Sequence, residues 1–456
     1  MPLTGLPFFA RVNRFVVAYS GGLDSHVLLH AAAAMRERFE GRELVALHVN
    51  HGLSARADDW SAHCAAQCEA LGVALVDRRV DATPRPGESP EATARELRYQ
   101  AFAASMRAGD CLLTAHHQDD QAETLLIQLL RGAGPRGLAA MPEYSAFAQG
   151  WHARPLLGYA RDALHELARQ AGLSWIDDES NSDTRFERNF LRHEILPRLK
   201  SRYPAAASTL SRAARLCGEA ADLLVTTARE DLALLRGGGK EGVKEDKEEG
   251  ALPVSGLQAL GEVRARNLLH QWCRDRDLPT PSAAQLQCIW EEVVGAGVDS
   301  EPVVSWVGGE ARRYRDALFF DRPLTAHDAG RCLPWDGRQR LSIPATASGG
   351  LMGELLGELH AEPVQGQGIA LAALERRRLE IRFRQGGEQL RPAGRAGHHA
   401  LKKLFQEAGI PPWRRDRIPL LYADGQLLAV AGLWVAQEAA AAADEPGLVL
   451  HWTARG

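Results

Sequence analysis

The sequence predicts an α/β protein with three domains: an N-terminal domain on a parallel sheet, a helical middle domain and a small α+β C-terminal domain. The first domain is indicated by four short apolar runs, at residues 15–19, 44–49, 73–80 and 111–115, which alternate with helical patterns. Strands that alternate with helices form parallel sheets with right-handed crossovers. The division into domains is indicated by a Gly-rich, charged stretch at 237–250, which has little to bury and is typical of a flexible linker.

Helical patterns separate the apolar runs of the first domain. One places Trp60, Cys64 and Cys68 on a single face. A second begins at Pro90, which fits the first turn of a helix, and a third covers residues 119–130. In such sheets, ligands bind at the carboxyl ends of the strands.

The remainder of the chain is predicted to be helical first and strand-rich later. We expect a long helix at 205–235, helical structure at 252–292, strands at 303–320 and a loose region rich in Gly, Pro and Ala at 326–368. The expected domains are residues 1–215, 216–325 and 365–456.

Composition is that of an ordinary globular protein, with 45% hydrophobic and 25% charged residues among 456. No apolar run approaches the length of a membrane span, and the N-terminus has no secretory signal pattern. The seven cysteines are scattered singly, which favours a reducing compartment. We therefore expect a cytoplasmic protein without membrane contact.

A glycine-containing loop follows the first predicted strand. The segment Ser20–Ser25 (SGGLDS) precedes an apolar helix, whose free amide groups and positive dipole end favour an anion. Asp24 repels phosphate by itself, so its presence indicates a Mg²⁺ ion between them. The predicted ATP-binding residues of this loop are Ser20, Gly21, Gly22, Leu23, Asp24 and Ser25.

Polar residues also follow the second and fourth strands. His48 and Asn50 could bond the ribose or base of a nucleotide, or merely cap a loop. Asp120 and Glu123 are three apart on a helix and so share a face. Their repulsion predicts a cation beside them, either Mg²⁺ or a substrate ammonium. His116, within the same motif, is as compatible with a structural as with a catalytic role.

A basic helix follows the acidic segment 177–183. Between residues 184 and 202 we count six Arg or Lys against two Glu. Arg188 and Arg192 lie in this stretch. The helix is predicted either to receive phosphates or to be a solvated face.

These motifs resemble a known family. The SGGLDS loop is similar to the SGGxDS loop of the PP-loop ATP pyrophosphatases, whose fold is Rossmann-like. The segments at 47–53, 114–124 and 177–192, and the pattern Glu91-x-x-Ala-Arg-x-x-Arg-Tyr99, resemble the tRNA(Ile)-lysidine synthases. The segment 401–413 resembles that family's C-terminal tRNA-binding domain.

The resemblance implies an AMP-forming ligase that uses ATP and Mg²⁺. Its partners would be free L-lysine and a tRNA(Ile) with the anticodon CAU, whose wobble cytidine becomes lysidine, so that it recognises AUA instead of AUG. A homodimer is compatible with the sequence. The catalytic residues would be Asp24, Asp120, Glu123 and Arg188, with Asp24 and Asp120 at the metal. The residues for tRNA or another substrate would be Arg95, Arg98, Arg192, Arg391, Arg395, Lys402, Lys403 and Arg414.

Charge in the C-terminal part favours an RNA partner. From residue 371 to 417 we count twelve Arg or Lys and five Asp or Glu. Phosphates attract such a surface. Trp413 could stack on a base or pack in a core.

Three alternatives remain at this stage. A PP-loop tRNA thiolase commonly needs a C-x-x-C pair, whereas Cys64 and Cys68 are four apart and better suited to a core. A synthetase with a glutaminase domain would need a catalytic cysteine near the N-terminus, and none is present there. A non-catalytic tRNA-binding protein would not need the intact SGGLDS loop.

Overall fold

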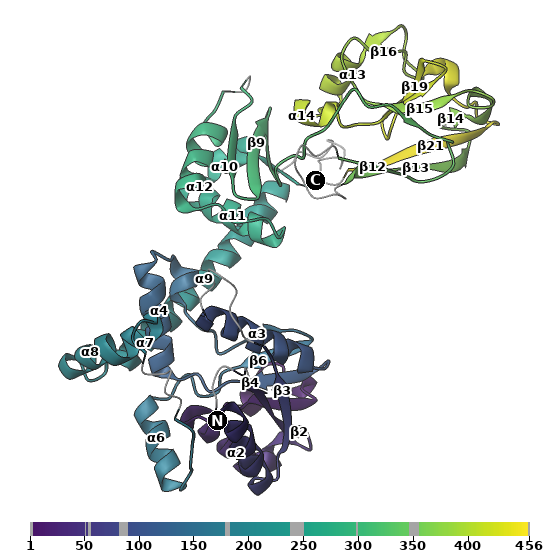
Figure 1. The fold of residues 1–456 in the computed structure, drawn as a ribbon. Helices are drawn as coiled ribbons and strands as arrows, with labels where there is room; N and C mark the ends of the chain where they lie inside the picture. The colour runs from purple at the N-terminus through teal and green to yellow at the C-terminus, as the bar shows by residue number, and fades with distance from the viewer. Residues whose placement is uncertain are drawn as a thin grey trace. The chain divides into compact units, whose positions relative to one another are not determined.

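The computed structural model describes residues 3–50, 52, 56–81, 90–177, 183–237, 250–297, 300–345 and 355–454. It divides into two compact units, Met1–Leu224 and Val225–Gly456 (Figure 1). None of the described helices combines the length and the apolar character that crossing a membrane requires. Of the linker predicted at 237–250, residues 238–249 lie outside the described residues.

The N-terminal unit contains the predicted parallel sheet. Strands β1 (Arg14–Ala18), β2 (Glu43–Asn50), β3 (Ala74–Arg79), β4 (Asp110–Leu113) and β6 (Gly150–Ala153) run parallel, and β5 (Tyr144–Phe147) is an antiparallel edge. The order is β3-β2-β1-β4-β6-β5. Because the chain moves outward from β1 to β3 and then returns to β4, the order reverses between β1 and β4. A ligand crevice is expected at such a point.

Helices cover both faces of this sheet. Phe15 and Val17 of β1 point into one core together with residues of α1 (Leu23–Ala34), α2 (Ala57–Ala70) and α6 (Arg161–Gln170). Val16 points into the opposite core, with Phe102 of α3 (Pro90–Ser105). Alternation along a strand explains this division, because successive side chains face opposite sides. The predicted strands and helices of this domain are confirmed.

The remaining helices of this unit follow β4 and β6 along the chain. They are α4 (Gln118–Leu130), α5 (Pro135–Leu138), α7 (Glu187–Phe190), a π-helical turn (Leu191–Ile195) and α8 (Leu196–Arg202). The long helix α9 (Ala206–Gly237) confirms the prediction at 205–235.

The second unit begins with a helical region on a small sheet. Helices α10 (Val254–Leu260), α11 (Glu262–Asp275), α12 (Ala283–Cys288) and a π-helical segment (Ile289–Val294) pack on strands in the order β7-β10-β9-β8. Those strands are β7 (Ala251–Pro253), β8 (Val303–Trp306), β9 (Gly309–Tyr314) and β10 (Ala317–Asp321). The strands predicted at 303–320 are therefore confirmed, as is helical structure after residue 253.

Antiparallel strands dominate the C-terminal part, with two short helices, α13 (Leu401–Glu407) and α14 (Pro412–Arg415). One sheet has the order β11-β15-β18-β19-β20 and another β12-β13-β21-β14. The strands are β11 (Leu333–Pro334), β12 (Leu341–Pro344), β13 (Leu355–Gln365), β14 (Ile369–Ala370), β15 (Leu379–Arg382), β16 (Gln389–Leu390), β17 (His399–Ala400), β18 (Leu420–Ala423), β19 (Gln426–Val430), β20 (Trp434–Val435) and β21 (Pro446–Ala454).

The prediction of a loose region at 326–368 is wrong where the structure forms β11, β12 and β13. Leu355–Gln365 forms β13, which pairs along its length with β21 (Figure 1). Pro363 is tolerated because β12 pairs with β13 only between Leu355 and Leu359, and no other described strand pairs with that edge of β13 at Pro363. The strand thus depends on a distant segment rather than on its own pattern.

Candidate active site

The loop Ser20–Ser25 joins β1 to α1 and has a geometry that requires glycine. Gly21 has a φ of +82°, and a Cβ there would lie 2.5 Å from Cδ1 of Ile176. Gly22 is the N-cap of α1 and forms no side-chain cap, so the first amide groups of the helix remain available to a ligand. The hydroxyls of Ser20 and Ser25 lie 3.0 Å apart and bond backbone groups of the loop. The loop is thus preformed for an anion.

Asp24 lies in the first turn of α1 and contacts the start of α4. Its Oδ2 lies 3.5 Å from Nε2 of His117, and its Oδ1 is buried with no hydrogen-bond partner among the described residues. Burial would raise the pKa of Asp24, but the hydrogen bond from His117 and the charges of Arg161 and Arg192 outweigh it, so this pKa lies below its usual value. Asp24 is therefore a charged carboxylate with one unpartnered oxygen.

This oxygen fits a bound Mg²⁺ ion. Carboxylate oxygens are ligands that Mg²⁺ prefers, and the ion usually keeps water and substrate phosphates as its other ligands. Within the part of the chain that the structure describes, no three His, Cys, Asp or Glu side chains gather as a metal site. Any ion at Asp24 would thus depend on phosphate oxygens and water.

His117 organises the start of α4 as its N-cap. Its Nδ1 accepts a hydrogen bond from the backbone N–H of Asp120 over 3.3 Å, and Asp120 Oδ2 accepts one from the N–H of His117 over 3.0 Å. Burial would lower the pKa of His117, but the carboxylates of Asp24 and Asp120 raise it above its usual value. The capping box therefore holds this helix start beside Asp24.

Four charged side chains from α4 and the basic segment form one cluster. Glu123 is fully buried, and its carboxylate accepts from Nε of Arg188 over 2.7 Å and from Nε of Arg192 over 2.7 Å. Asp120 Oδ1 lies 2.9 Å from Nη2 of Arg192 and 3.3 Å from Nη2 of Arg188. The repulsion between Asp120 and Glu123 is thus balanced here by two guanidinium groups.

A polar cavity of about 270 Å³ adjoins this cluster. Asp119, Glu123, Arg161, Asp162, Arg192, His193, Leu196, Pro197 and Lys200 line it. Asp119 forms an ion pair with Lys200 through Oδ2, while its buried Oδ1 has no partner among the described residues. Because the lining carries both cationic and anionic groups, the cavity suits a small molecule with charges of both signs.

Sequence reasoning did not identify Asp119, Arg161, Asp162 and Lys200 as site residues. Arg161 and Asp162 begin α6, which follows β6, and no motif distinguishes them. Asp119 lies in the same motif, directly before Asp120 and four residues before Glu123, and this helical spacing is the signal that the sequence offered. The acidic segment at 178–182, which was part of a predicted motif, lies outside the described residues.

His48 and Asn50, predicted to contact ATP, end β2 and are buried. His48 Nδ1 donates to the carbonyl of Tyr19 over 2.9 Å. The amide nitrogen of Asn50 donates to Ser61 Oγ over 3.2 Å, and its Oδ1 accepts from Gly52 N over 3.0 Å. Both side chains have partners within the protein, and their contacts with ATP stay predictions.

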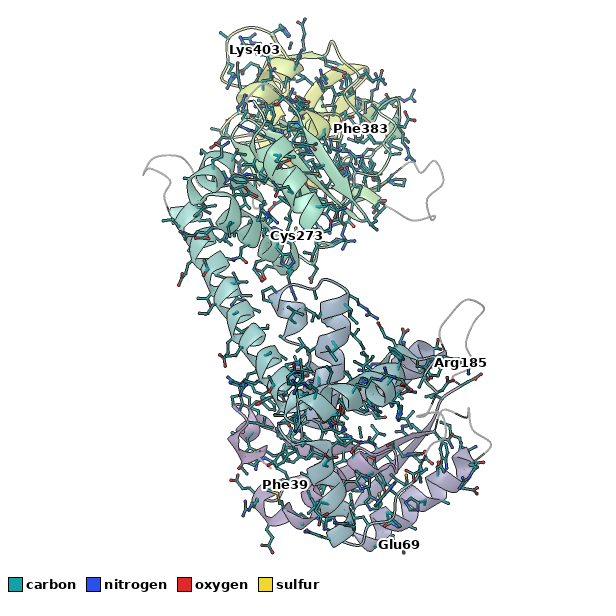
Figure 2. The ribbon with its side chains drawn as sticks, turned by 90° about the vertical axis from the view of Figure 1, so that its left-hand side faces the viewer. Phe39, Glu69, Arg185, Cys273, Phe383 and Lys403 are labelled. Atoms are coloured by element: carbon teal, nitrogen blue, oxygen red, sulfur yellow. The ribbon has the colours of Figure 1, made fainter. Side chains whose placement is uncertain are left out.

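Predicted tRNA-binding residues lie both on α3, which carries Arg95 and Arg98, and in the C-terminal part of the chain. The guanidinium of Arg95 lies 5.0 Å above the ring of Tyr99, also on α3. Lys402 and Lys403 are exposed on α13, as Figure 2 shows for Lys403. Arg391 is also exposed, whereas Arg395 forms a 2.7 Å ion pair with Glu407.

Trp413 and Arg414 lie against the β9–β10 hairpin. Trp413 stands edge-on to Phe319, with ring centroids 5.6 Å apart, and its indole nitrogen is buried. Nη2 of Arg414 lies 3.3 Å from Oδ2 of Asp321. Of the two interpretations of Trp413, packing is the one that its surroundings support.

Cys64 and Cys68 do not support sulfur-transfer chemistry. Cys64 and Cys68 are buried in the core of the first domain, and burial raises the pKa of Cys64 to about 12 and that of Cys68 to about 11. A thiol of this kind is not a nucleophile at neutral pH. The prediction that both are core residues is confirmed.

The parallel sheet with a glycine loop after its first strand defines the N-terminal unit as a PP-loop domain, and residues 7–199 match the model of that domain family. Residues 252–319 match the TilS substrate binding domain, and residues 379–452 match the TilS substrate C-terminal domain.

Curated relatives resemble the chain over almost its whole length. The tRNA(Ile)-lysidine synthase of Methylococcus capsulatus is 45% identical over 97% of this chain and 96% of its own. The enzyme of that name from Coxiella burnetii is 41% identical over 95% and 92%. The chain belongs to the tRNA(Ile)-lysidine synthase family. Among solved structures, the U34-tRNA thiolase NcsA from Methanococcus maripaludis is 18% identical, with a TM-score of 0.39 over 45% of this chain and 72% of that one.

Proposed function

We propose that this chain ligates free L-lysine to the wobble cytidine of a tRNA(Ile) with the anticodon CAU, at the expense of ATP. Its membership of the family supports this reaction. The single structural observation that carries the proposal is the position of Asp24: it lies in the preformed phosphate loop and contacts His117 at the start of the helix that bears Asp120 and Glu123. A phosphate site and a cluster for a charged substrate thus adjoin within one domain.

The reaction has two steps in this proposal. The ring carbonyl oxygen of the cytidine attacks the α-phosphorus of ATP, a new P–O bond forms and pyrophosphate leaves. The ε-amine of lysine then attacks the activated carbon, loses a proton and displaces AMP. Alternatives without ATP cleavage are not favoured, because the loop and Asp24 are both intact.

The loop Ser20–Ser25 would hold the pyrophosphate portion of ATP through the amide groups at the start of α1. Asp24 would hold Mg²⁺ through its unpartnered Oδ1. When bound, Mg²⁺ neutralises charge on the phosphates. Asp120 was also predicted as a metal ligand, but both of its oxygens have protein partners here, so we assign the ion to Asp24 first.

Lysine would bind in the cavity beside Glu123. A free amino acid carries a carboxylate and ammonium groups, and the cavity offers Arg161 and Arg192 to the former and Asp119 to the latter. Oδ1 of Asp119 is suited to an ammonium because it is buried without a partner among the described residues. Glu123 would act on lysine through Arg188 and Arg192, since its own oxygens are occupied by them.

The tRNA would be bound by the basic C-terminal part as well as by the first domain. Lys402 and Lys403 are exposed, and such groups gain by neutralising phosphates. Arg95 and Arg98 on α3 would contact the same tRNA near the reacting base. Base modification requires a base that can be splayed out of its loop, as anticodon bases can be.

The proposal is tested by transfer of labelled lysine to a CAU-anticodon tRNA(Ile) transcript with ATP and Mg²⁺, with release of AMP followed in parallel. We expect incorporation that disappears when the wobble cytidine is replaced by uridine. Release of AMP without incorporation of lysine would contradict the proposed second step. Absence of ATP turnover with any tRNA would contradict the reaction as a whole.

A further inference from the structure

A second polar network lies behind the charged cluster, at the carboxyl ends of β4 and β6. Oγ1 of Thr114 lies 2.8 Å from Nδ1 of His116 and 2.8 Å from Nε2 of His152. Nδ1 of His152 lies 3.2 Å from Nη2 of Arg154. His152 and Thr114 are buried, so these bonds are not exchanged with water.

The directions of these hydrogen bonds follow from the one group that can only donate. Arg154 has no acceptor, so Nδ1 of His152 must accept from it. A neutral His152 then carries its proton on Nε2 and donates to Oγ1 of Thr114. The hydroxyl proton of Thr114 is left to donate to Nδ1 of His116. His116 is therefore fixed as the tautomer with its proton on Nε2.

Both imidazoles are neutral in this environment. Burial and the charges of Arg154 and Arg95 lower the pKa of His152 to about 3. Burial, with Arg154, Arg188 and Arg95, lowers the pKa of His116 well below its ordinary value. The chain of donors is consequently intact at neutral pH.

The last donor of this series of hydrogen bonds, Nε2–H of His116, is available to a ligand. Among the described residues, no hydrogen bond is formed by Nε2 of His116, and the residue is only partly buried. No carboxylate of a described residue pairs with Arg154 or with Arg95, although Arg188 has Asp120 and Glu123. A donor surrounded by uncompensated positive charge favours an anionic oxygen.

We propose that Arg154 is a positioning residue, which acts through His152 and Thr114 to present Nε2–H of His116 to a phosphate oxygen of the substrates. The inference rests on the proposed function, because it places this donor at the phosphate chemistry of that site. The phosphate is either the α-phosphate of ATP or a backbone phosphate of the tRNA next to the wobble nucleotide. A neutral donor stabilises charge on that oxygen without giving up its proton.

Substitutions at Thr114 test this series of hydrogen bonds, because they alter only the hydroxyl group that links His152 to His116. Thr114→Val keeps the shape and removes the link, so His116 can adopt either tautomer. We expect the rate of pyrophosphate release to fall about tenfold, the effect of one lost hydrogen bond. Thr114→Ser keeps the hydroxyl and should restore most of the rate. Thr209→Val, at an exposed position on α9, is the matched control and should be without effect.

A double-substitution cycle separates this role from simple packing. In His116→Gln, the side-chain amide donates without any tautomer to fix, so adding Thr114→Val should cause no further loss. An equal loss in both backgrounds would overturn the proposal, as would full activity of Thr114→Val. A raised Kd for ATP in the absence of tRNA assigns the oxygen to ATP, whereas a raised KM for tRNA alone assigns it to the RNA backbone. No change in either constant or in the rate would overturn both assignments.

Histidine-labelled NMR spectra of the full chain give a readout that does not depend on turnover. The signal of His116, assigned by its loss in His116→Gln, should show the Nε2–H tautomer in the parent chain and a mixture in Thr114→Val. A mixture in the parent would overturn the inference even if lysidine is formed. The expected tautomer without lysidine formation would instead overturn the proposed function.

Discussion

Nε2 of His117 lies 3.5 Å from Oδ2 of Asp24, so the cap of α4 contacts the first turn of α1. Because Nδ1 of His117 accepts a backbone hydrogen bond, the neutral ring carries its proton on Nε2, toward Asp24. This contact orients one carboxylate oxygen of Asp24, while the other has no hydrogen-bond partner within the part of the chain that the structure describes. The contact thereby fixes the N-terminus of α1 and the N-terminus of α4 relative to each other.

The orientation of Asp24 leads to a first prediction. Asp24→Asn keeps the size of the side chain and the bond from His117 but removes the negative charge that would hold Mg²⁺. We expect pyrophosphate release to fall on the order of 100-fold or more, since a bound metal contributes several kcal/mol. Filter binding of the tRNA should be unchanged. Retained turnover would remove Asp24 from the metal site.

A second prediction concerns the phosphate loop. Gly21→Ala places a Cβ 2.5 Å from Ile176 at a φ of +82°, so we expect a loss of roughly 1–3 kcal/mol in the free energy of unfolding and weaker ATP binding. Gly22→Ala is the matched control, because its φ is −74° and its Cβ would meet only ordinary contacts, with Oγ of Ser20 at 3.5 Å and the carbonyl oxygen of Ile176 at 3.8 Å. Urea unfolding and ATP titration measure both variants. Equal effects would show that the conformation of Gly21 is not the cause.

The elements that the sequence predicted are those whose pattern is local. Strands β1, β2 and β4 appear as apolar runs because inner parallel strands are buried on both faces. β13 was not predicted because it is stabilised by pairing with β21, which lies about 80 residues or more further along the chain. No window around Leu355–Gln365 contains that partner.

For the site too, the sequence predicted which residues carry charge, but it did not predict which of them lie together in space. The motif residues Asp120 and Glu123 could be named from their spacing, and so could the need for a cation beside them. The cations turn out to be the guanidinium groups of Arg188 and Arg192. The sequence could not predict this, because only the folded chain brings these two residues to α4. The network from Arg154 to His116 could not be predicted from the sequence for the same reason, because β4 and β6 become neighbours only in the folded sheet.

The occupied carboxylate of Glu123 gives a third prediction. Glu123→Gln leaves two partly buried guanidinium groups without their main partner, and we expect a loss of about 2–3 kcal/mol in the free energy of unfolding. The KM for lysine should rise more than the KM for ATP. Glu187→Gln removes an exposed partner of Arg131 and should cost under about 0.5 kcal/mol. An unchanged lysine dependence would contradict a role of Glu123 at the lysine site.

The neutral state of His152 predicts acid sensitivity. Its pKa is about 3 in the folded chain and about 6.5 when unfolded, so the unfolded state binds more protons between these values. Stability is therefore full above about pH 6.5 and falls as the pH drops, by up to about 1.4 kcal/mol per pH unit from this group. In His152→Gln the free energy of unfolding should depend less on pH across this range. Identical pH dependence in urea titrations of both chains would contradict a buried neutral His152.

The exposed lysines of α13 give the last prediction. Replacing Lys402 and Lys403 together by Ala removes two cations, so the slope of log affinity for tRNA against log salt should become shallower by roughly two. Replacing both by Arg keeps the charges and should keep the slope. Because the α13 surface is distant in sequence from the phosphate loop, ATP affinity in the absence of tRNA should be unchanged in both variants. An unaltered slope in the Ala variant would mean that tRNA phosphates are neutralised elsewhere, for instance at Arg391, and would shift the predicted contact surface away from α13.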